Sequence, residues 1–260
     1  MRTHQPCSTC NSSDGLTEYE KNTYCFSCGE FKYKGKTPTE FEHYFPIWED
    51  THTEEGLQLP YTTNSKFNHR AESWLMKNGL TPALRSLYRI GFVANETVPV
   101  PKSKWTVKLQ NRIIFPCYGV NGLLYYQARA TDPDDKVKYY TIGEKAPFWA
   151  HRHEDKKSIV ITEDIVSTIR AGIITNAVAL CGTKFSKELL LQLTENYDRI
   201  IVWMDSDRAG VRAARELTKR LRLLTDNVVK VRSRKEAKQC HTSELNRILS
   251  QYMASDISQL

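Results

Sequence analysis

Apolar runs alternate with helical segments in the C-terminal part of the chain. Each run has the length and the β-branched content of a buried strand, and the segments between them space their apolar residues as helices do. The expected strands cover residues 158–162, 177–180, 199–204 and 227–232, and the expected helices cover 164–171, 186–197, 208–224 and a closing stretch from 243 to 252. This alternation predicts a parallel α/β sheet.

The segment ahead of this sheet has a different pattern. Helical spacing runs from about Phe67 to Val93, with Pro82 near a helix start, and predicts two short helices. Alternating apolar and polar positions then predict a small β-rich unit within residues 98–150. Its expected strands cover residues 111–118, 123–131 and 136–142, separated by the turns GVNG and DPDD.

Charge divides the chain of 260 residues into unequal parts. Residues 1–60 hold 5 of the 37 Lys and Arg residues and 10 of the 30 Asp and Glu residues, so the remaining 200 residues hold 32 and 20, a net charge of +12. Between Pro38 and Pro60 six acidic residues occur without a Lys or Arg, which is typical of a solvated linker. A basic body suits a protein that binds a polyanion, although solubility alone accounts for many such balances.

The changes in periodicity and in charge along the chain predict four segments. They are a small N-terminal domain at 1–37, an acidic linker at 38–66, a first core subdomain at 67–155 and a parallel-sheet subdomain at 156–260. No window of about 18 apolar residues and no signal peptide is visible, so we expect a cytoplasmic protein without a membrane partner.

Four of the seven cysteines form two Cys-x2-Cys pairs near the N-terminus. The ligand candidates are Cys7, Cys10, Cys25 and Cys28. Two such pairs can place four thiolates around one tetrahedral zinc ion, and a segment this short needs a metal because it cannot bury a core of its own. With all four positions filled by protein, the zinc is expected to be structural.

Acidic residues follow two of the predicted parallel strands. Glu163 and Asp164 come directly after the strand IVIT, and Asp205 and Asp207 follow the strand IIVWM. The carboxyl ends of parallel strands form the edge where open α/β sheets bind ligands. Carboxylates that converge there repel one another unless a cation neutralises them, and Mg²⁺ or Mn²⁺ prefers such oxygen ligands. Asp164 and Asp207 also stand where helix N-caps are expected.

This constellation resembles a known domain. Glu163 after a strand, then Gly182-Thr183-Lys-Phe-Ser186, then Asp205-Ser-Asp207-Arg-Ala-Gly210 is similar to the Toprim domain of bacterial-type primases, type IA and II topoisomerases and some nucleases. A zinc ribbon and a linker ahead of it resemble the DNA primases of bacteria and, more closely, of bacteriophages. In the middle region Arg112, Arg129 and Lys138 resemble the basic motifs of the primase core.

The resemblance implies a fold and a function. The fold would be a zinc ribbon tethered to a mixed α/β primase core, of the α+β and α/β classes, containing a parallel-sheet Toprim fold. The enzyme would synthesise RNA primers from ribonucleoside triphosphates on single-stranded DNA, with a replicative helicase supplied in trans, in the host cytoplasm if it is encoded by a phage. Glu163, Asp205 and Asp207 would hold catalytic Mg²⁺ or Mn²⁺, and Arg112, Arg129 and Lys138 would bind nucleotide or template.

The chain departs from the family pattern at three positions. Asp164 stands where a glycine is usual, and Ser167 stands where the family has a further acidic residue. The acidic residue that often follows the fourth strand has only Glu236 as a counterpart, within a lysine-rich stretch. Asp164 is therefore considered as a substitute ligand for a second Mg²⁺ ion.

Two other functions remain open on the sequence. A Toprim nuclease or a topoisomerase-like enzyme would need a nucleophilic tyrosine or hydrolytic groups, and none can be identified among the 13 tyrosines. A recombination mediator that only binds DNA is favoured by Ser167, but such proteins usually carry a helical hairpin before the zinc site, and only six residues precede Cys7.

The expected helix at 208–224 separates its charges from its apolar residues. Five cations recur at steps of four and three residues and so share one face, and five apolar residues share the other. The cations are Arg208, Arg212, Arg215, Lys219 and Arg222, and the apolar residues are Val211, Ala214, Leu217, Leu221 and Leu224. The cationic face is either a solvated surface or a contact for a nucleic-acid backbone.

Overall fold

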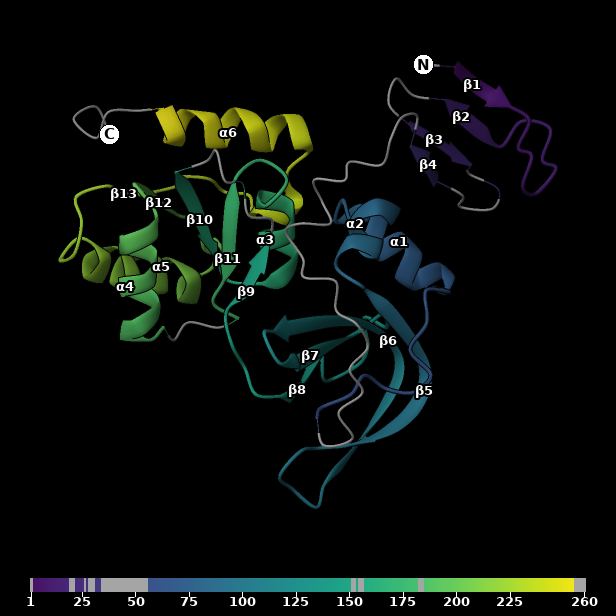
Figure 1. The fold of residues 1–260 in the computed structure, drawn as a ribbon, viewed down its shortest axis with the longest axis horizontal. Helices are drawn as coiled ribbons and strands as arrows, with labels where there is room; N and C mark the ends of the chain where they lie inside the picture. The colour runs from purple at the N-terminus through teal and green to yellow at the C-terminus, as the bar shows by residue number, and fades with distance from the viewer. Residues whose placement is uncertain are drawn as a thin grey trace.

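Three β-sheets organise the part of the chain that the computed structural model describes (Figure 1). The described residues are 2–18, 22–25, 27, 31–33, 56–150, 153, 157–181 and 185–254. The N-terminal sheet is antiparallel, with its strands in sequence order. Its strands are β1 (Arg2–Gln5), β2 (Leu16–Glu18), β3 (Asn22–Cys25) and β4 (Phe31–Tyr33).

Two helices and a second antiparallel sheet form the next unit. The helices begin at caps that can be read in the sequence, because Asn68 accepts a hydrogen bond from the Ala71 amide and Thr81 accepts one from the Leu84 amide, with Pro82 at the first helical position. The elements are α1 (His69–Lys77), α2 (Pro82–Leu87), β5 (Gly91–Pro99), β6 (Thr106–Gly119), β7 (Gly122–Ala130) and β8 (Tyr139–Gly143).

The third sheet has five strands in the order β13-β12-β10-β11-β9. Neighbours pair in parallel except for β9, which runs antiparallel to β11 at one edge. The strands are β9 (Phe148–Ala150), β10 (Ser158–Thr162), β11 (Asn176–Ala179), β12 (Arg199–Val202) and β13 (Val228–Lys230). The helical elements are α3 (Ile165–Ala171), α4 (Lys187–Asn196), α5 (Arg208–Leu221), the 3₁₀ turn η2 (Ala237–Gln239) and α6 (Thr242–Ala254).

Helices cover both faces of this sheet. Ile159, Ile161 and Val178 point to the face that packs on α4 and α5. Val160 and Ala177 point to the opposite face, where α3 and α6 lie, and that apolar cluster continues into α1, α2 and one face of the antiparallel sheet. The predicted mixed α/β fold with a parallel sheet is therefore confirmed.

Two strands escaped prediction. The helical pattern was expected to run to Val93, but a strand, β5, begins at Gly91. Its first three residues are all buried, so they lack the alternation that marks a strand, and β5 is stabilised by its long pairing with β6. The edge strand β9 has only three residues, too few for a pattern to show.

The last part of the predicted linker packs on the antiparallel sheet. Leu57 and Leu59 lie against its apolar face, and the carboxylate of Glu96 accepts hydrogen bonds from the Tyr61 and Thr62 amides at 2.8 Å each. Residues 57–62 are thus attached to the core, although their sequence assigns them to the linker. The acidic stretch from 38 to 55 lies outside the described residues.

The packing of α5 agrees with its sequence pattern in part. Ala214, Leu217 and Leu221 are buried against the sheet, as expected. Val211 is 44% exposed and Leu224 is 45% exposed, so the expectation that they pack on the sheet is wrong. They lie near the two ends of the helix, beyond the short strands β12 and β13 that it covers.

One buried arginine joins the two larger units. Arg170 on α3 is only 4% exposed, and its guanidinium donates to the carbonyl of Gly79 at 3.2 Å, in the loop between α1 and α2. It also donates to the carbonyl of Cys240, after η2, at 2.9 Å and to the Thr242 hydroxyl at 3.3 Å. Gly79 has φ +69°, and a Cβ there would lie 2.7 Å from the guanidinium carbon of Arg170, so this position requires glycine.

In the part of the chain that the structure describes, no helix has the length and the apolar character that crossing a bilayer requires.

We expect Arg170→Met to lower the free energy of unfolding by about 2–3 kcal/mol, because it leaves buried carbonyls without donors. Urea denaturation followed by circular dichroism measures the change. Arg220→Met is the matched control, since Arg220 forms an exposed pair with Glu216 and its loss should cost less than about 1 kcal/mol. Equal midpoints for the two variants would contradict a joining role for Arg170.

Candidate metal centre

Three carboxylates converge at the carboxyl edge of the parallel sheet. Asp164 follows β10, Asp205 follows β12, and Glu236 follows β13 and precedes η2. Each offers one carboxylate oxygen within 4.8 Å of the oxygens of the other two. Because these three strands are neighbours in the sheet, residues far apart in sequence share one site. We call this group the acidic cluster.

The two expected helix caps are both present. Asp164 caps α3, with Oδ1 accepting from the amides of Val166 and Ser167, and Asp207 caps α5 by accepting from the Gly210 amide at 2.7 Å. Asp164 keeps its second oxygen, Oδ2, on the side of the cluster. Asp207 is exposed and does not belong to the acidic cluster.

Lys238 lies among the carboxylates of the acidic cluster. Its Nζ is 2.6 Å from Glu236 Oε2, 3.0 Å from Asp164 Oδ2 and 4.0 Å from Asp205 Oδ2. Burial lowers the pKa of Lys238, but the carboxylates outweigh it and the net pKa is raised. One ammonium therefore offsets part of the negative charge, and the rest stays uncompensated.

Burial and the uncompensated negative charge raise the pKa values of two acids, Asp205 and Glu163. Burial is the largest cause at Asp205, where it acts together with Asp164, Glu236 and Glu163 against the attraction of Lys238 and raises the pKa to about 7. Burial also raises the pKa of Glu163, with further contributions from Asp207 and Asp164. Both groups are held in surroundings that disfavour their ionised forms until more positive charge arrives.

Glu163 provides an independent sign that a cation fits here. Its Oε2 is buried and has no hydrogen-bond partner among the described residues. A buried carboxylate oxygen without a donor is costly, and a divalent cation shared with the acidic cluster would satisfy it. Hard oxygen ligands of this kind match Mg²⁺ or Mn²⁺.

The sequence therefore identified part of this site. Asp164 and Asp205 belong to the acidic cluster, Glu163 interacts with it electrostatically, and Asp207 caps α5. Glu236 belongs to the cluster although its lysine-rich context argued against it. The signal that could have found it is the order of the sheet, because β13 neighbours β12 and brings the segment after it to the same edge.

Arg112 does not occupy the position expected of a ligand-binding residue. It is 2% exposed, and its guanidinium lies over the Tyr140 ring while Nη2 binds Asp135 and Nη1 donates to the Val137 carbonyl at 2.8 Å. A group enclosed in this way cannot contact nucleotide or template. Instead it fixes the loop that carries Lys138, which corrects the role predicted for it.

The other two basic residues lie where β7 pairs with β8, with Arg129 on β7 opposite Tyr139 and Lys138 directly before β8. Arg129 is held between the rings of Trp74 and Tyr139, with its guanidinium carbon 4.0 Å and 5.2 Å from their centroids. Lys138 is exposed. The pKa of Tyr139 is raised, chiefly by burial, and the charges of Asp164 and Lys238 also act on it. The start of β8 is thus close enough to the acidic cluster to interact with it electrostatically.

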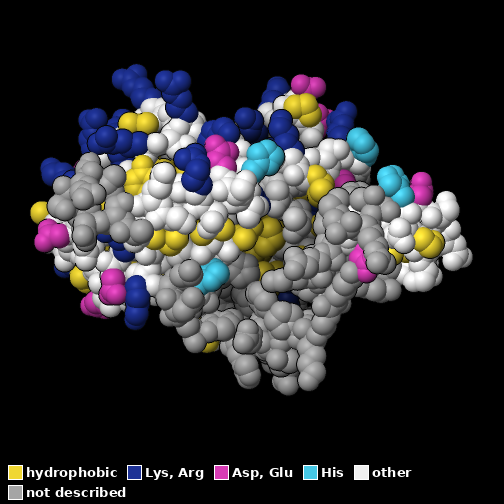
Figure 2. All heavy atoms as spheres, turned by 90° about the horizontal axis from the view of Figure 1, so that it is seen from above, with side chains coloured by type: hydrophobic (Ala, Val, Ile, Leu, Met, Phe, Trp, Pro, Cys, Tyr) yellow, Lys and Arg dark blue, Asp and Glu magenta, His cyan; other side chains and the backbone are white. Residues whose placement is uncertain are grey.

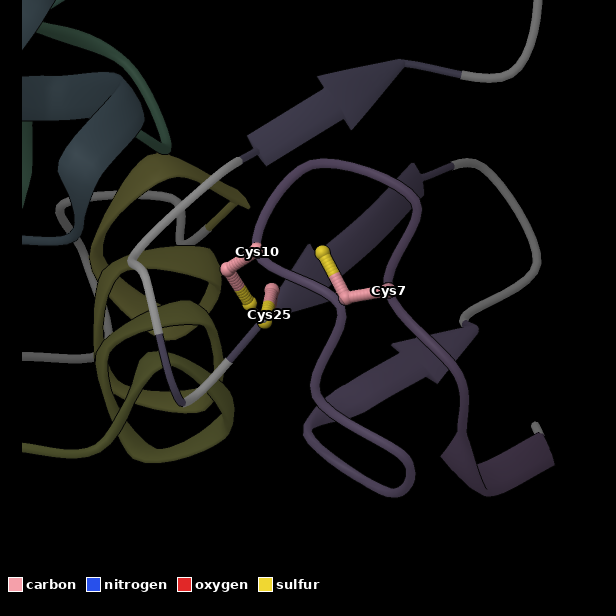
Figure 3. A group of neighbouring side chains, drawn as sticks. All are labelled: Cys7, Cys10 and Cys25. Carbon is pink, nitrogen blue, oxygen red and sulfur yellow. Dashed lines mark hydrogen bonds between the residues drawn. The ribbon is translucent and has the colours of Figure 1, made fainter.

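A second candidate metal site lies in the N-terminal sheet. Cys7, Cys10 and Cys25 each offer a sulfur within 4.8 Å of the other two, and the Sγ atoms of Cys10 and Cys25 are 3.7 Å apart (Figure 3). Hydrogen bonds from the amides of Cys10 and Thr9 lower the pKa of Cys7 to about 6, which favours the thiolate that binds metal. Cys28, the fourth expected ligand, lies outside the described residues.

The remaining motif of the Toprim pattern is described only at its end. Ser186 caps α4 by accepting from the Leu189 amide at 3.1 Å. Gly182, Thr183 and Lys184 lie outside the described residues.

We expect Asp205→Asn to stabilise the protein by about 1–2 kcal/mol at pH 8, in the absence of divalent metal. The folded pKa of about 7 lies above the ordinary value of 3.8, so the folded state binds the proton more tightly and loses stability as pH rises between these values. The gain should therefore shrink as pH falls from 7 and vanish near pH 4. Urea denaturation at pH 4–8 measures it, and a difference that does not vary with pH would contradict the assigned pKa.

The comparisons with known proteins agree with this fold. Residues 161–241 match the Toprim-like family. The DNA primase of Listeria monocytogenes is 26% identical over 185 residues, which are 55% of this chain and 29% of that protein. The chain thus spans less than a third of the length of this curated relative.

Two solved structures share the fold. The Aquifex aeolicus primase, solved with its zinc-binding and RNA polymerase domains, has a TM-score of 0.58 and 15% identity over 96% of this chain and 77% of that one. The catalytic domain of DnaG primase bound to single-stranded DNA has a TM-score of 0.56 and 17% identity over 71% of each chain. Residues 161–241 therefore match a Toprim-like domain, and the chain has the fold of a primase catalytic core, which agrees with the resemblance seen in its sequence.

Proposed function

We propose that this protein is a DNA primase, which synthesises RNA primers on single-stranded DNA by metal-dependent nucleotidyl transfer. The observation that carries the proposal is the acidic cluster at the carboxyl edge of a Toprim-like sheet, and the buried, unpartnered oxygen of Glu163, which interacts with the cluster electrostatically, supports it. A site of this kind can hold the divalent cations that phosphoryl-transfer chemistry uses.

Several acidic residues would together bind these cations. Glu163, Asp205 and Glu236 would bind Mg²⁺ or Mn²⁺, with Asp164 as a further ligand through Oδ2 and Asp207 at the rim. The bound metal supplies Lewis-acid activation of the attacking 3′-hydroxyl and neutralises charge on the triphosphate. Asp164 would also hold the N-terminus of α3 in place while it binds metal.

The basic residues would position the anionic substrates. Lys138 is exposed beside the acidic cluster and would contact the triphosphate or the template. Arg129, held flat between two rings, would present its guanidinium edge to a phosphate. Arg112 would act indirectly, because it fixes the loop on which Lys138 stands.

The N-terminal sheet would read the template. We propose that Cys7, Cys10, Cys25 and Cys28 bind a structural zinc ion, since three of the sulfurs already converge and thiolates are typical zinc ligands. The strands of this sheet would then present their side chains to single-stranded DNA.

The proposed partners are single-stranded DNA, ribonucleoside triphosphates and a replicative helicase acting in trans, in the cytoplasm of a phage-infected host. The structure of DnaG primase with single-stranded DNA supports the first of these by analogy. A phage origin rests on the sequence resemblance alone.

A strand-cutting enzyme is less well supported. It would need a tyrosine that ionises easily next to the metal site. Tyr139 feels the charges of the acidic cluster, yet its pKa is raised, chiefly by burial, so its hydroxyl is a poorer nucleophile than an ordinary tyrosine. The raised pKa keeps the Tyr139 hydroxyl protonated near neutral pH, so this residue gives no support to a cleavage mechanism.

Asp205→Ala and Glu236→Ala should each lower primer synthesis by more than about 100-fold, since a catalytic metal stabilises the transition state by several kcal/mol. Incorporation of labelled ribonucleotides on single-stranded templates of varied sequence, with Mg²⁺ or Mn²⁺, measures this. Asp226→Ala removes an exposed carboxylate elsewhere and should keep full activity. A wild-type protein that binds DNA but makes no primers would instead support a recombination mediator.

Cys25→Ser should release the zinc and abolish initiation at template sites while extension of a supplied primer continues. The physical reason is that a segment this short folds only around its metal, whereas the core carries its own apolar interior. Zinc content and the two activities are measured on the same preparation, with Cys117→Ser as the control for loss of a buried thiol elsewhere. If initiation and extension fell equally, the N-terminal sheet would not be the template reader.

A further inference from the structure

A basic cleft lies at the edge of the parallel sheet, around strand β13. Its volume is about 530 Å³, and it lies between α5, β13 with the residues that follow it, and Tyr252 on α6. The cations that line it are Arg215, Lys219, Arg222, Lys230 and Arg232. We call this the β13 cleft. Figure 2 shows that Lys and Arg side chains gather at the end of the molecule that carries this sheet.

The β13 cleft is separate from the acidic cluster. Asp207, at the rim of the metal centre, begins α5, whereas Arg222 follows the last residue of that helix. At 1.5 Å of rise per residue, the 15 residue steps from Asp207 to Arg222 correspond to about 22 Å. Arg222 is therefore far from the metal centre, and no ion pair joins any of the five cleft cations to the acidic cluster among the described residues.

The charges in the β13 cleft are not balanced by the protein. All five cations are exposed, no acidic residue lines the cleft, and none of the five enters an ion pair within the part of the chain that is described. Arg222 donates only to the Val228 carbonyl, at 3.3 Å. By contrast, Arg220, on another side of α5, pairs with Glu216. The same helix thus neutralises one face and leaves the cleft face positive.

Each cation taken singly can be explained without a ligand. Exposed Lys and Arg residues are usually solvated, and positive charges beside an edge strand such as β13 discourage pairing with another chain. Solvation and protection of an edge strand do not require the cations to face one another across a cleft. Here the cations come from both sides of a cleft, three from α5 and its C-cap residue and two from the chain at and after β13.

The arrangement fits a linear polyanion better than a single phosphate. Arg215, Lys219 and Arg222 rise along α5 in steps of about 6 Å and 4.5 Å, so they form a row about 10 Å long. A single phosphate group would meet one or two of them, whereas successive phosphates of a strand can meet all three. The Thr218 hydroxyl donates to the Ala214 carbonyl within its own helix, so the cleft floor offers few groups that could read base edges.

We propose that the β13 cleft binds the sugar–phosphate backbone of single-stranded DNA, without sequence preference and apart from the metal centre. The bound strand would lie along the second half of α5, held by charge and by the release of counterions. This binding needs no nucleotide or divalent metal, so it stands or fails independently of primase activity.

The test measures binding of a fluorescent oligothymidylate by anisotropy, without nucleotides or divalent metal, across a series of salt concentrations. The groove variant carries Arg215→Gln, Lys219→Gln and Arg222→Gln. The matched control carries Lys102→Gln, Lys104→Gln and Lys108→Gln, which remove the same charge from exposed positions in the β5–β6 loop and on β6. A second variant, Lys230→Gln with Arg232→Gln, tests the opposite wall of the β13 cleft. Thermal unfolding establishes that each variant is folded.

The groove variant should bind at least about tenfold more weakly at 100 mM salt, and the slope of log K against log salt should fall by about two, since three phosphate contacts are lost. The second variant should show the same trend with a smaller change in slope. The control should differ from wild type by less than about threefold. If the groove variant and the control bind alike, net charge alone attracts DNA and the proposal is wrong. It is equally wrong if inorganic phosphate at millimolar concentration competes as well as an oligonucleotide, because the cleft would then bind single phosphates.

Asp205→Ala separates this proposal from the proposed function. It should bind the oligonucleotide as wild type does while making no primers. Should the groove variant bind DNA normally and the wild type still make primers, only the cleft proposal would fail.

Discussion

Repulsion among carboxylates is the constraint on which the site depends. Parallel pairing of β10 with β12 and of β12 with β13 delivers an acidic residue from each strand end to the same edge. Backbone hydrogen bonds fix that geometry, so the carboxylates cannot move apart to relieve it. The protein offsets part of the repulsion with Lys238 and part with the α3 amides that bind Asp164, and the remainder leaves Asp205 with a pKa of about 7.

Asp164 shows how one side chain can serve the fold and the site together. Its first oxygen caps α3, and its second receives the Ser167 hydroxyl at 2.7 Å and the Lys238 ammonium at 3.0 Å. A glycine at this position, as the family pattern has, could do neither. Ser167, which stands where the family has an acidic residue, here donates to the carboxylate one turn earlier. The two departures from the pattern are therefore coupled, because the Ser167 hydroxyl donates a hydrogen bond to the Asp164 carboxylate.

The sequence predicted the strands and helices that are determined by local periodicity and by helix caps. The strand at 158–162 and the helices that follow Asp164, Ser186 and Asp207 were predicted within a few residues, because short-range patterns determine them. What it could not predict depends on partners distant in the chain. The burial of Arg112 depends on Asp135 and the ring of Tyr140, and the place of Glu236 depends on the order of strands in the sheet. A lysine-rich stretch such as that around Glu236 looks like solvated surface until the fold directs Lys238 inward.

The hydrogen bonds of Arg170 bear on how the molecule accommodates what it binds. The planar guanidinium donates in fixed directions, and here it holds the α1–α2 loop, the end of η2 and the start of α6 at once. A hinge between the antiparallel unit and the parallel sheet would have to break the bond to Gly79 and separate the apolar cluster that the two units share. The contact between the α1–α2 loop and α3 is consequently part of the structure before any ligand arrives. A rigid junction of this kind leaves any movement on ligand binding to segments other than the α1–α2 loop, α3 and the start of α6.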